Sequence, residues 1–414
     1  AIVLISLITE FLYIFNNKYT YSKLQPEKGV LTLSQEEIDS NSFHFLIKDW
    51  EFYEDALLTP TYFKNQTSLP NMKYVSIGDT ESAYTSQTKN NTFIGTYRMK
   101  INFPEKEGFY ALEMPQVYSA YELYINDKLY LKVGDTHNYK AQIQNRCTFF
   151  AASGETYITI AVKDASGIKA GITSPPTLGK PYSINITRAF KFLINNFIMT
   201  LIFFGALFSL ILAISGKSNY SYMFFFMCLI YAVYLNHPLI NLCFSMGGNF
   251  SYVFEYFCTH FVYLMVIMLQ NRLCNLNKNV SSISEICGSV FCAIAFVYGV
   301  FTPYLSAPLC TFLSTLCNVF EWLAAIYLVA IGTYAVFNDI KYGRIFLFGN
   351  VCFAASLLLY IIQPLYDSIY TDQSVEMGIL TILGCLYFVY WASIIDNYRR
   401  NIVLDDERRL MERQ

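Results

Sequence analysis

Charged residues are scarce in this chain. Asp, Glu, Lys and Arg make up 14% of its 414 residues, against about 25% in typical soluble proteins. Their distribution is uneven, because residues 16–191 hold 19 Lys and Arg and 18 Asp and Glu, as an ordinary soluble surface does. Lys and Arg are rare between 192 and 397, where apolar residues dominate. The first part predicts a soluble domain, and the second predicts a membrane-embedded one.

Other absences exclude several classes of protein. The soluble part contains a single cysteine, Cys147, so it cannot be a disulfide scaffold, and the other ten cysteines are interpreted as small membrane hydrophobes. The four histidines (44, 137, 237 and 260) lack metal-ligand spacing, and no glycine-rich phosphate loop occurs. Basic residues are too sparse for nucleic-acid binding. We therefore expect no metal, no cofactor, no nucleic-acid partner and no catalytic constellation in this chain.

The soluble part shows short runs in which apolar and polar residues alternate. In one of them Tyr97, Met99 and Ile101 share a face, and polar residues occupy the other face. Turn sequences separate the runs, and long helical periodicity is absent. We therefore expect residues 18–190 to form an antiparallel β-sandwich of the jelly-roll type. The predicted strands lie in 43–47, 92–103, 109–114, 120–133, 156–164 and 182–192.

Seven apolar segments follow, each near the roughly 20 residues that cross a bilayer. They are about 193–215, 221–243, 252–271, 283–303, 308–337, 344–364 and 376–396. Basic residues occur only in alternate connections and after the last segment, which predicts that these parts face the cytoplasm and that the β-sandwich is extracellular. These residues are Lys217, Arg272, Lys278, Lys341, Arg344, Arg399 and Arg400.

The first residues, AIVLISLITEFLYIF, predict an additional transmembrane anchor. The segment ends in bulky residues rather than in the small residues of a cleavage site, so an uncleaved helix is expected. The resulting fold class is a membrane protein with an extracellular β-sandwich and a seven-helix bundle. The expected parts are an anchor (1–17), a sensor domain (18–190), a seven-transmembrane domain (191–397) and a cytoplasmic helix (398–414).

Three stretches, DWEFYEDALLTP, GTYRMKINFP and YALEMPQVYSAYELYINDKLYLKVG, resemble the β-galactosidase-like, galactose-binding-like jelly roll that binds sugars. With the seven apolar segments, the chain resembles the bacterial seven-transmembrane receptors with diverse intracellular signalling modules, over most of 40–397. That resemblance implies an extracellular small-molecule or carbohydrate ligand, a homodimer in the lipid bilayer, and a cytoplasmic output. The output is often a histidine kinase with its response regulator and sometimes a diguanylate cyclase or phosphatase; none lies in this sequence.

Candidate ligand-binding residues lie in the soluble part. Trp50 is either an aromatic platform for a sugar or, as the favoured alternative, a core residue. His137 lies in the polar loop GDTHNYK, which is a second candidate or a plain hydrophilic turn. A polar face of adjacent strands could hydrogen-bond a ligand, or could simply be solvated. This face comprises Arg98, Lys100, Glu113, Glu122 and Tyr124.

Candidate switch residues lie within the apolar segments. Glu321 is near the middle of its segment, with Asn318 three residues earlier, and an ionisable group at that depth suggests function or a buried structural hydrogen bond. Glu255 and His260 are weaker candidates, for which a structural role is favoured. We expect a signal receptor that passes ligand binding through the helices. A transporter or intramembrane enzyme using Glu321, and a surface binding protein without output, remain alternatives.

Overall fold

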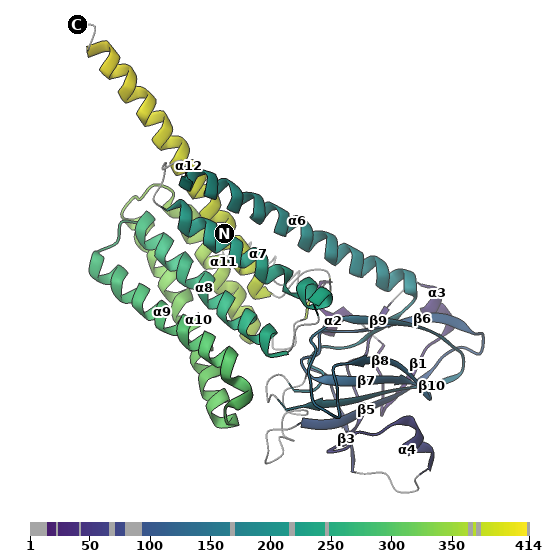
Figure 1. Cartoon of the computed structure of the whole chain (residues 1–414). Helices are drawn as coiled ribbons and strands as arrows, with labels where there is room; N and C mark the ends of the chain where they lie inside the picture. The colour runs from purple at the N-terminus through teal and green to yellow at the C-terminus, as the bar shows by residue number, and fades with distance from the viewer. Residues whose placement is uncertain are drawn as a thin grey trace.

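The computed structural model places a β-rich domain beside a bundle of long helices, and its last helix, α12, extends past the bundle on the side away from the β-strands (Figure 1). We call the two sheets and their connections the β-domain. The structure describes residues 15–21, 24–40, 43–65, 71–78, 93–165, 170–214, 220–244, 248–362, 367–369 and 374–411. Residues 1–14, which hold most of the expected anchor, lie outside these ranges.

The β-domain contains two sheets packed on a common core, which confirms the predicted antiparallel sandwich except for one parallel strand pair. The larger sheet has the order β4 (Met72–Val75), β3 (Trp50–Glu54), β5 (Phe93–Asn102), β10 (Glu155–Asp164), β7 (Ala120–Ile125) and β8 (Lys128–Val133). In addition, β1 (Val30–Thr32) pairs with β5 in parallel. The smaller sheet has the order β2 (Phe43–Phe45), β11 (Thr177–Gly179), β6 (Gly108–Met114) and β9 (Arg146–Ala152). Short helices are α2 (Lys18–Tyr21), α3 (Gln35–Asp39) and α4 (Pro60–Asn65).

The core of the sandwich follows the alternation read from the sequence. Tyr97, Met99 and Ile101 of β5 are at most 1% exposed, and they pack with residues of the smaller sheet such as Leu112 and Phe150. Burying each such side chain contributes about 1.5–3 kcal/mol. The same alternation leaves every second side chain of β5 on the face turned away from the core, where Arg98 and Lys100 lie.

Each of the seven predicted apolar segments lies largely within one long helix. Five of the described helices are long and apolar enough to cross a membrane, and two shorter apolar stretches lie in α7 and α11. Crossing by all seven remains a prediction. The helices are α6 (Pro181–Ile214), α7 (Ser221–Phe244), α8 (Gly248–Leu273), α9 (Lys278–Phe301), α10 (Ala307–Phe337), α11 (Gly343–Ile362) and α12 (Ser374–Met411), with a 3₁₀ turn, η1 (Thr302–Tyr304), before α10.

The strand predicted at 182–192 is wrong, because these residues form the first three turns of α6. Pro181 occupies the first helical turn, where its missing N–H costs nothing. The helix formed by the following apolar segment extends towards the N-terminus through these residues. The helix tolerates the β-branched side chains that suggested a strand. The boundary expected at residue 190 therefore falls inside a helix that starts at the β-domain.

Candidate functional site

Trp50 lies in the core of the β-domain. Its side chain is fully buried, its ring meets Tyr97 edge-on at 6.4 Å, and its indole Nε1 donates to the Leu46 carbonyl at 3.0 Å. The N–H group is the only hydrogen-bond donor of the indole, and its acceptor lies inside the protein. This position agrees with the core alternative and leaves no ring face for a sugar.

Arg98 is held on the opposite face of the same sheet by aromatic rings. Its guanidinium lies 4.3 Å from the ring centres of both Phe63, in α4, and Tyr157, in β10. Glu51 of β3 accepts a hydrogen bond from the Tyr53 hydroxyl at 3.0 Å and lies 3.6 Å from the Arg98 guanidinium. Burial, reinforced by Glu51, raises the pKa of Tyr53 to about 12. Because a guanidinium has five fixed donors, a preordered Arg98 suits a ligand carboxylate or paired hydroxyls.

The residues predicted to share a polar face with Arg98 all have partners within the protein. Tyr124 shares a row with Arg98, since both pair with Thr159 of β10. Lys100 lies on the same strand as Arg98 and pairs with Glu155 at 2.5 Å. The predicted single face is wrong for Glu113, because Glu113 lies on β6 of the smaller sheet, where it pairs with Arg188 of α6 at 3.2 Å. His137 is exposed in its loop, where its backbone N–H donates to Asp135 at 2.9 Å.

Glu122 is a structural carboxylate of this face. It accepts hydrogen bonds from Tyr124 at 2.6 Å and Thr136 at 3.2 Å, and Lys132 lies at 3.2 Å. Burial opposes its charge, but these hydrogen bonds and Lys132 outweigh that effect and lower the pKa of Glu122.

A Glu122→Gln variant should lose about 1–3 kcal/mol of β-domain stability at pH 7, because a buried, hydrogen-bonded charge is removed. A lowered folded-state pKa stabilises the fold above the unfolded pKa of about 4.3, and that contribution disappears as pH falls through the folded-state pKa. The stability difference between the parent chain and the variant should therefore shrink on acidification. Hydrogen exchange of β7 and β8, with both chains compared at each pH, measures it; a pH-independent difference would contradict this assignment.

The β-domain contacts the helices at a first junction on α7 and α8. The Tyr118 hydroxyl donates a short hydrogen bond to Glu255, and Tyr118 packs with Ile143 and Tyr256. The Gln144 side chain donates to the backbone carbonyl of residue 241 in α7 at 3.0 Å. Burial and then the Glu255 charge raise the pKa of Tyr118, so it stays a hydrogen-bond donor at neutral pH.

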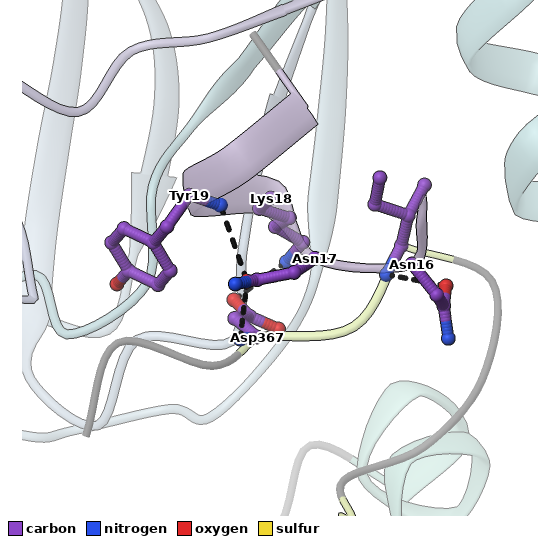
Figure 2. Close-up of polar contacts among 6 residues, drawn as sticks. Asn16, Asn17, Lys18, Tyr19 and Asp367 are labelled. Atoms are coloured by element: carbon purple, nitrogen blue, oxygen red, sulfur yellow. Dashed lines mark hydrogen bonds and ion pairs between the residues drawn. The ribbon is translucent and has the colours of Figure 1, made fainter. Parts of the chain in front are cut away.

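A second junction joins the N-terminal segment to residues 367–369, which lie between α11 and α12 (Figure 2). The backbone N–H of Lys18 donates to the Asp367 carbonyl at 2.8 Å, and that of Ile369 donates to the Asn16 carbonyl at 3.2 Å. The Asn17 side chain accepts from the Asp367 backbone N–H at 3.1 Å, and the Lys18 ammonium pairs with the Asp367 carboxylate at 2.7 Å.

The apolar side of the second junction reaches the sandwich. Ile369 is 4% exposed and packs with Phe43 and Phe45 of β2. Five residues further along, α12 begins, and its Glu376 accepts a hydrogen bond from Tyr234 of α7 at 2.9 Å. The β-domain thus contacts the chain at Ile369, five residues before α12 begins.

The candidate switch residues within the helices are not brought together. His260 is fully buried, with its Nδ1 2.8 Å from the Tyr256 carbonyl and its ring stacked on Phe320 at 5.6 Å. Asn318 is exposed on α10, whereas Glu321 is partly buried and makes no hydrogen bond or ion pair with described residues. A role for Glu321 in switching or transport remains a prediction.

No protein-family model matches the chain, and neither does any curated protein sequence. Similar solved structures include a GH2 beta-galacturonidase from Eisenbergiella tayi (11% identity, 34% of this chain and 24% of that chain, TM-score 0.24) and a beta-glucuronidase from an uncultured Clostridium sp. (16%, 34%, 29%, 0.26). A Faecalibacterium prausnitzii beta-glucuronidase is also similar (13%, 34%, 31%, 0.24). The chain spans about a quarter to a third of the length of these enzymes. At such identity and TM-score the similarity supports no functional argument.

Proposed function

We propose that this chain is the sensory and transmembrane part of a bacterial signal receptor. An extracellular ligand, a carbohydrate or another small polar molecule, binds the β-domain, and the helices transmit its binding to the cytoplasmic end of α12. The observation that carries the proposal is α12 itself. It runs without interruption over 38 residues, about 57 Å, and begins five residues after Ile369 of the second junction.

Two further contacts support transmission along α12. At its first turn, Glu376 is bound to α7 by Tyr234 and by the Tyr231 hydroxyl, which donates to the Glu376 carbonyl at 3.1 Å. Near the opposite end of the bundle, Tyr342 donates to Asp396 at 2.6 Å. A helix held at these two positions transmits a displacement as a shift or a rotation, as in known helix-shift transitions.

The ligand face proposed is the surface around Arg98 and Tyr124. A charged or hydroxyl-rich ligand would find an ordered guanidinium between two rings and an adjacent phenol. Glycans carrying carboxylates fit this chemistry, because Arg binds carboxylates in a bidentate manner. Signal transmission then requires that occupancy of this face alters one of the two junctions.

The proposal is tested by following the α12 tail directly. Labels placed through unnatural amino acids at Val403 and at a β-domain site avoid the 11 native cysteines. Uronic acids and neutral sugars are then added to the intact chain in nanodiscs, and the distance between the labels is measured. We expect one ligand class to change this distance, and Arg98→Leu to abolish the change while Lys128→Leu, on exposed β8, preserves it. Ligand binding at Arg98 with an unchanged distance would contradict the receptor proposal.

A further inference from the structure

A small cavity lies between the smaller sheet and α3 of the β-domain. His44, from the middle of β2, forms part of its wall and is only 8% exposed. The rest of the wall is mainly apolar and comprises Leu33, Ile38, Tyr110, Leu178, Gly179 and Lys180. The buried Nε2 atom of His44 has no hydrogen-bond partner among the residues that the structure describes. A buried ring nitrogen without a partner is uncommon in folded proteins and is a candidate functional group.

Charged and titratable groups surround the cavity on three elements. On α3, the Glu37 carboxylate takes part in the capping box at the start of that helix. Asp39, at the end of α3, pairs with Lys180, which directly precedes α6, at 3.4 Å. The Tyr110 phenol comes from β6. None of these groups gives the His44 Nε2 atom a hydrogen bond in the described part of the chain.

The imidazole of His44 suits this cavity only in its neutral form. The neutral ring can leave Nε2 without a proton, whereas protonation puts an N–H on both ring nitrogens. The added N–H would face a mainly apolar wall without an acceptor, and burial accordingly lowers the pKa of His44. The Glu37 charge opposes this effect without overcoming it, and hydrogen bonds at the start of α3 lower the pKa of Glu37 itself. A protonated ring is therefore more stable outside the cavity, near Glu37 and water.

Strand β2 connects this cavity to the second junction. Because side chains alternate along a strand, Phe43 and Phe45 lie on the face of β2 opposite His44. On that face they pack with Ile369. The strand is three residues long and lies at the edge of the smaller sheet, where its neighbour is β11. A short edge strand has little local stability, so displacing one buried side chain can move it.

We propose that His44 is a proton-binding site through which acidification loosens the second junction. The imidazole takes up one proton from water, leaves the cavity and carries β2 away from β11 and from Ile369. The proton returns to water when the pH rises, so the change is reversible. The effect of this change on α12 rests on the proposed function, whereas the binding of the proton and the movement of β2 do not.

The expected pH range follows from the chemistry of histidine. A folded-state pKa below the unfolded value of about 6.5 destabilises the fold increasingly as the pH falls below 6.5, and has no effect well above it. Between about pH 7.5 and about pH 5.5, histidine is the only side chain whose ordinary pKa is in range. Of the other histidines, His137 is exposed in its loop, and His237 and His260 lie in α7 and α8.

Hydrogen exchange of the intact chain in nanodiscs tests the site, with rates corrected for the intrinsic effect of pH. Between about pH 7.5 and about pH 5.5, we expect the protection of residues 43–45 to fall about tenfold, the equivalent of one unit of lowered pKa. The peptide that contains Ile369 should lose protection over the same range. His44→Gln stays neutral at both pH values and should remove both changes. The matched control, His137→Gln, should respond as the parent chain does.

A second variant, His44→Leu, covers the case in which the glutamine amide weakens β2 at both pH values, because a leucine suits the apolar wall. A parent chain without the pH effect, or variants at position 44 that keep it, would overturn the proposal. The distance from the β-domain label to the Val403 label is measured in the same samples without ligand. If residues 43–45 and Ile369 lose protection but this distance stays constant, His44 is confirmed as the proton site and the receptor proposal is contradicted.

Discussion

Replacing Trp50 with alanine is expected to destabilise the β-domain by about 3–5 kcal/mol, the largest single-residue effect predicted for this chain. Trp50 is fully buried against Tyr97, and its truncation leaves a cavity and an unpaired Leu46 carbonyl. Domains are stable by only about 5–15 kcal/mol, so the variant should approach unfolding. Hydrogen exchange of the central strands β5 and β10 in the intact chain measures the loss.

The control for Trp50 is another aromatic residue of the β-domain. Phe109 is 60% exposed, so Phe109→Ala should change stability by no more than about 0.5 kcal/mol. If Trp50→Ala left exchange protection intact and removed only sugar binding, Trp50 would be a ligand platform, and the core assignment would be wrong.

The sandwich was predictable because its alternation is local. A period of two in 92–103 identifies which side chains are buried without knowledge of the partner strands. The error at 182–192 has the same origin, since β-branched residues there mimic a strand. The structure shows a helix here for two reasons. The helix continues into the next apolar segment, and Ile184 packs on the β-domain.

The junctions were not predictable, because they join residues far apart in the sequence. Glu255 was singled out as a polar group in an apolar segment, but its partner Tyr118 is 137 residues away and looks like any strand-edge tyrosine. Asn17 and Asp367 are 350 residues apart, and both appear in polar stretches that carry no motif. Polar residues flanking predicted spans are the only sequence signal for such contacts.

Among the conformational predictions, the largest effect is expected from a covalent lock on the second junction. Asn17 and Ser368 form an antiparallel bridge. The flanking hydrogen bonds, from Lys18 to Asp367 and from Ile369 to Asn16, make this a non-hydrogen-bonded pair with its Cα atoms about 4.5 Å apart. That separation is compatible with a disulfide. In an Asn17→Cys/Ser368→Cys chain, oxidation should abolish the ligand-induced change at the α12 tail, and reductant should restore it.

The physical reason is that the proposed signal must alter the attachment between β2 and the start of α12, and a covalent bond there prevents separation. Each single cysteine variant controls for the loss of Asn17 or Ser368 alone. A Lys18→Met variant should loosen the second junction, because it removes the ion pair between Lys18 and Asp367. The two side chains are only 16% and 21% exposed, so we expect the position of the α12 tail to change without ligand. If ligand still changed the α12 tail fully in the oxidised chain, the second junction would only fix the β-domain in place. The signal would then pass through Tyr118 and Glu255 of the first junction.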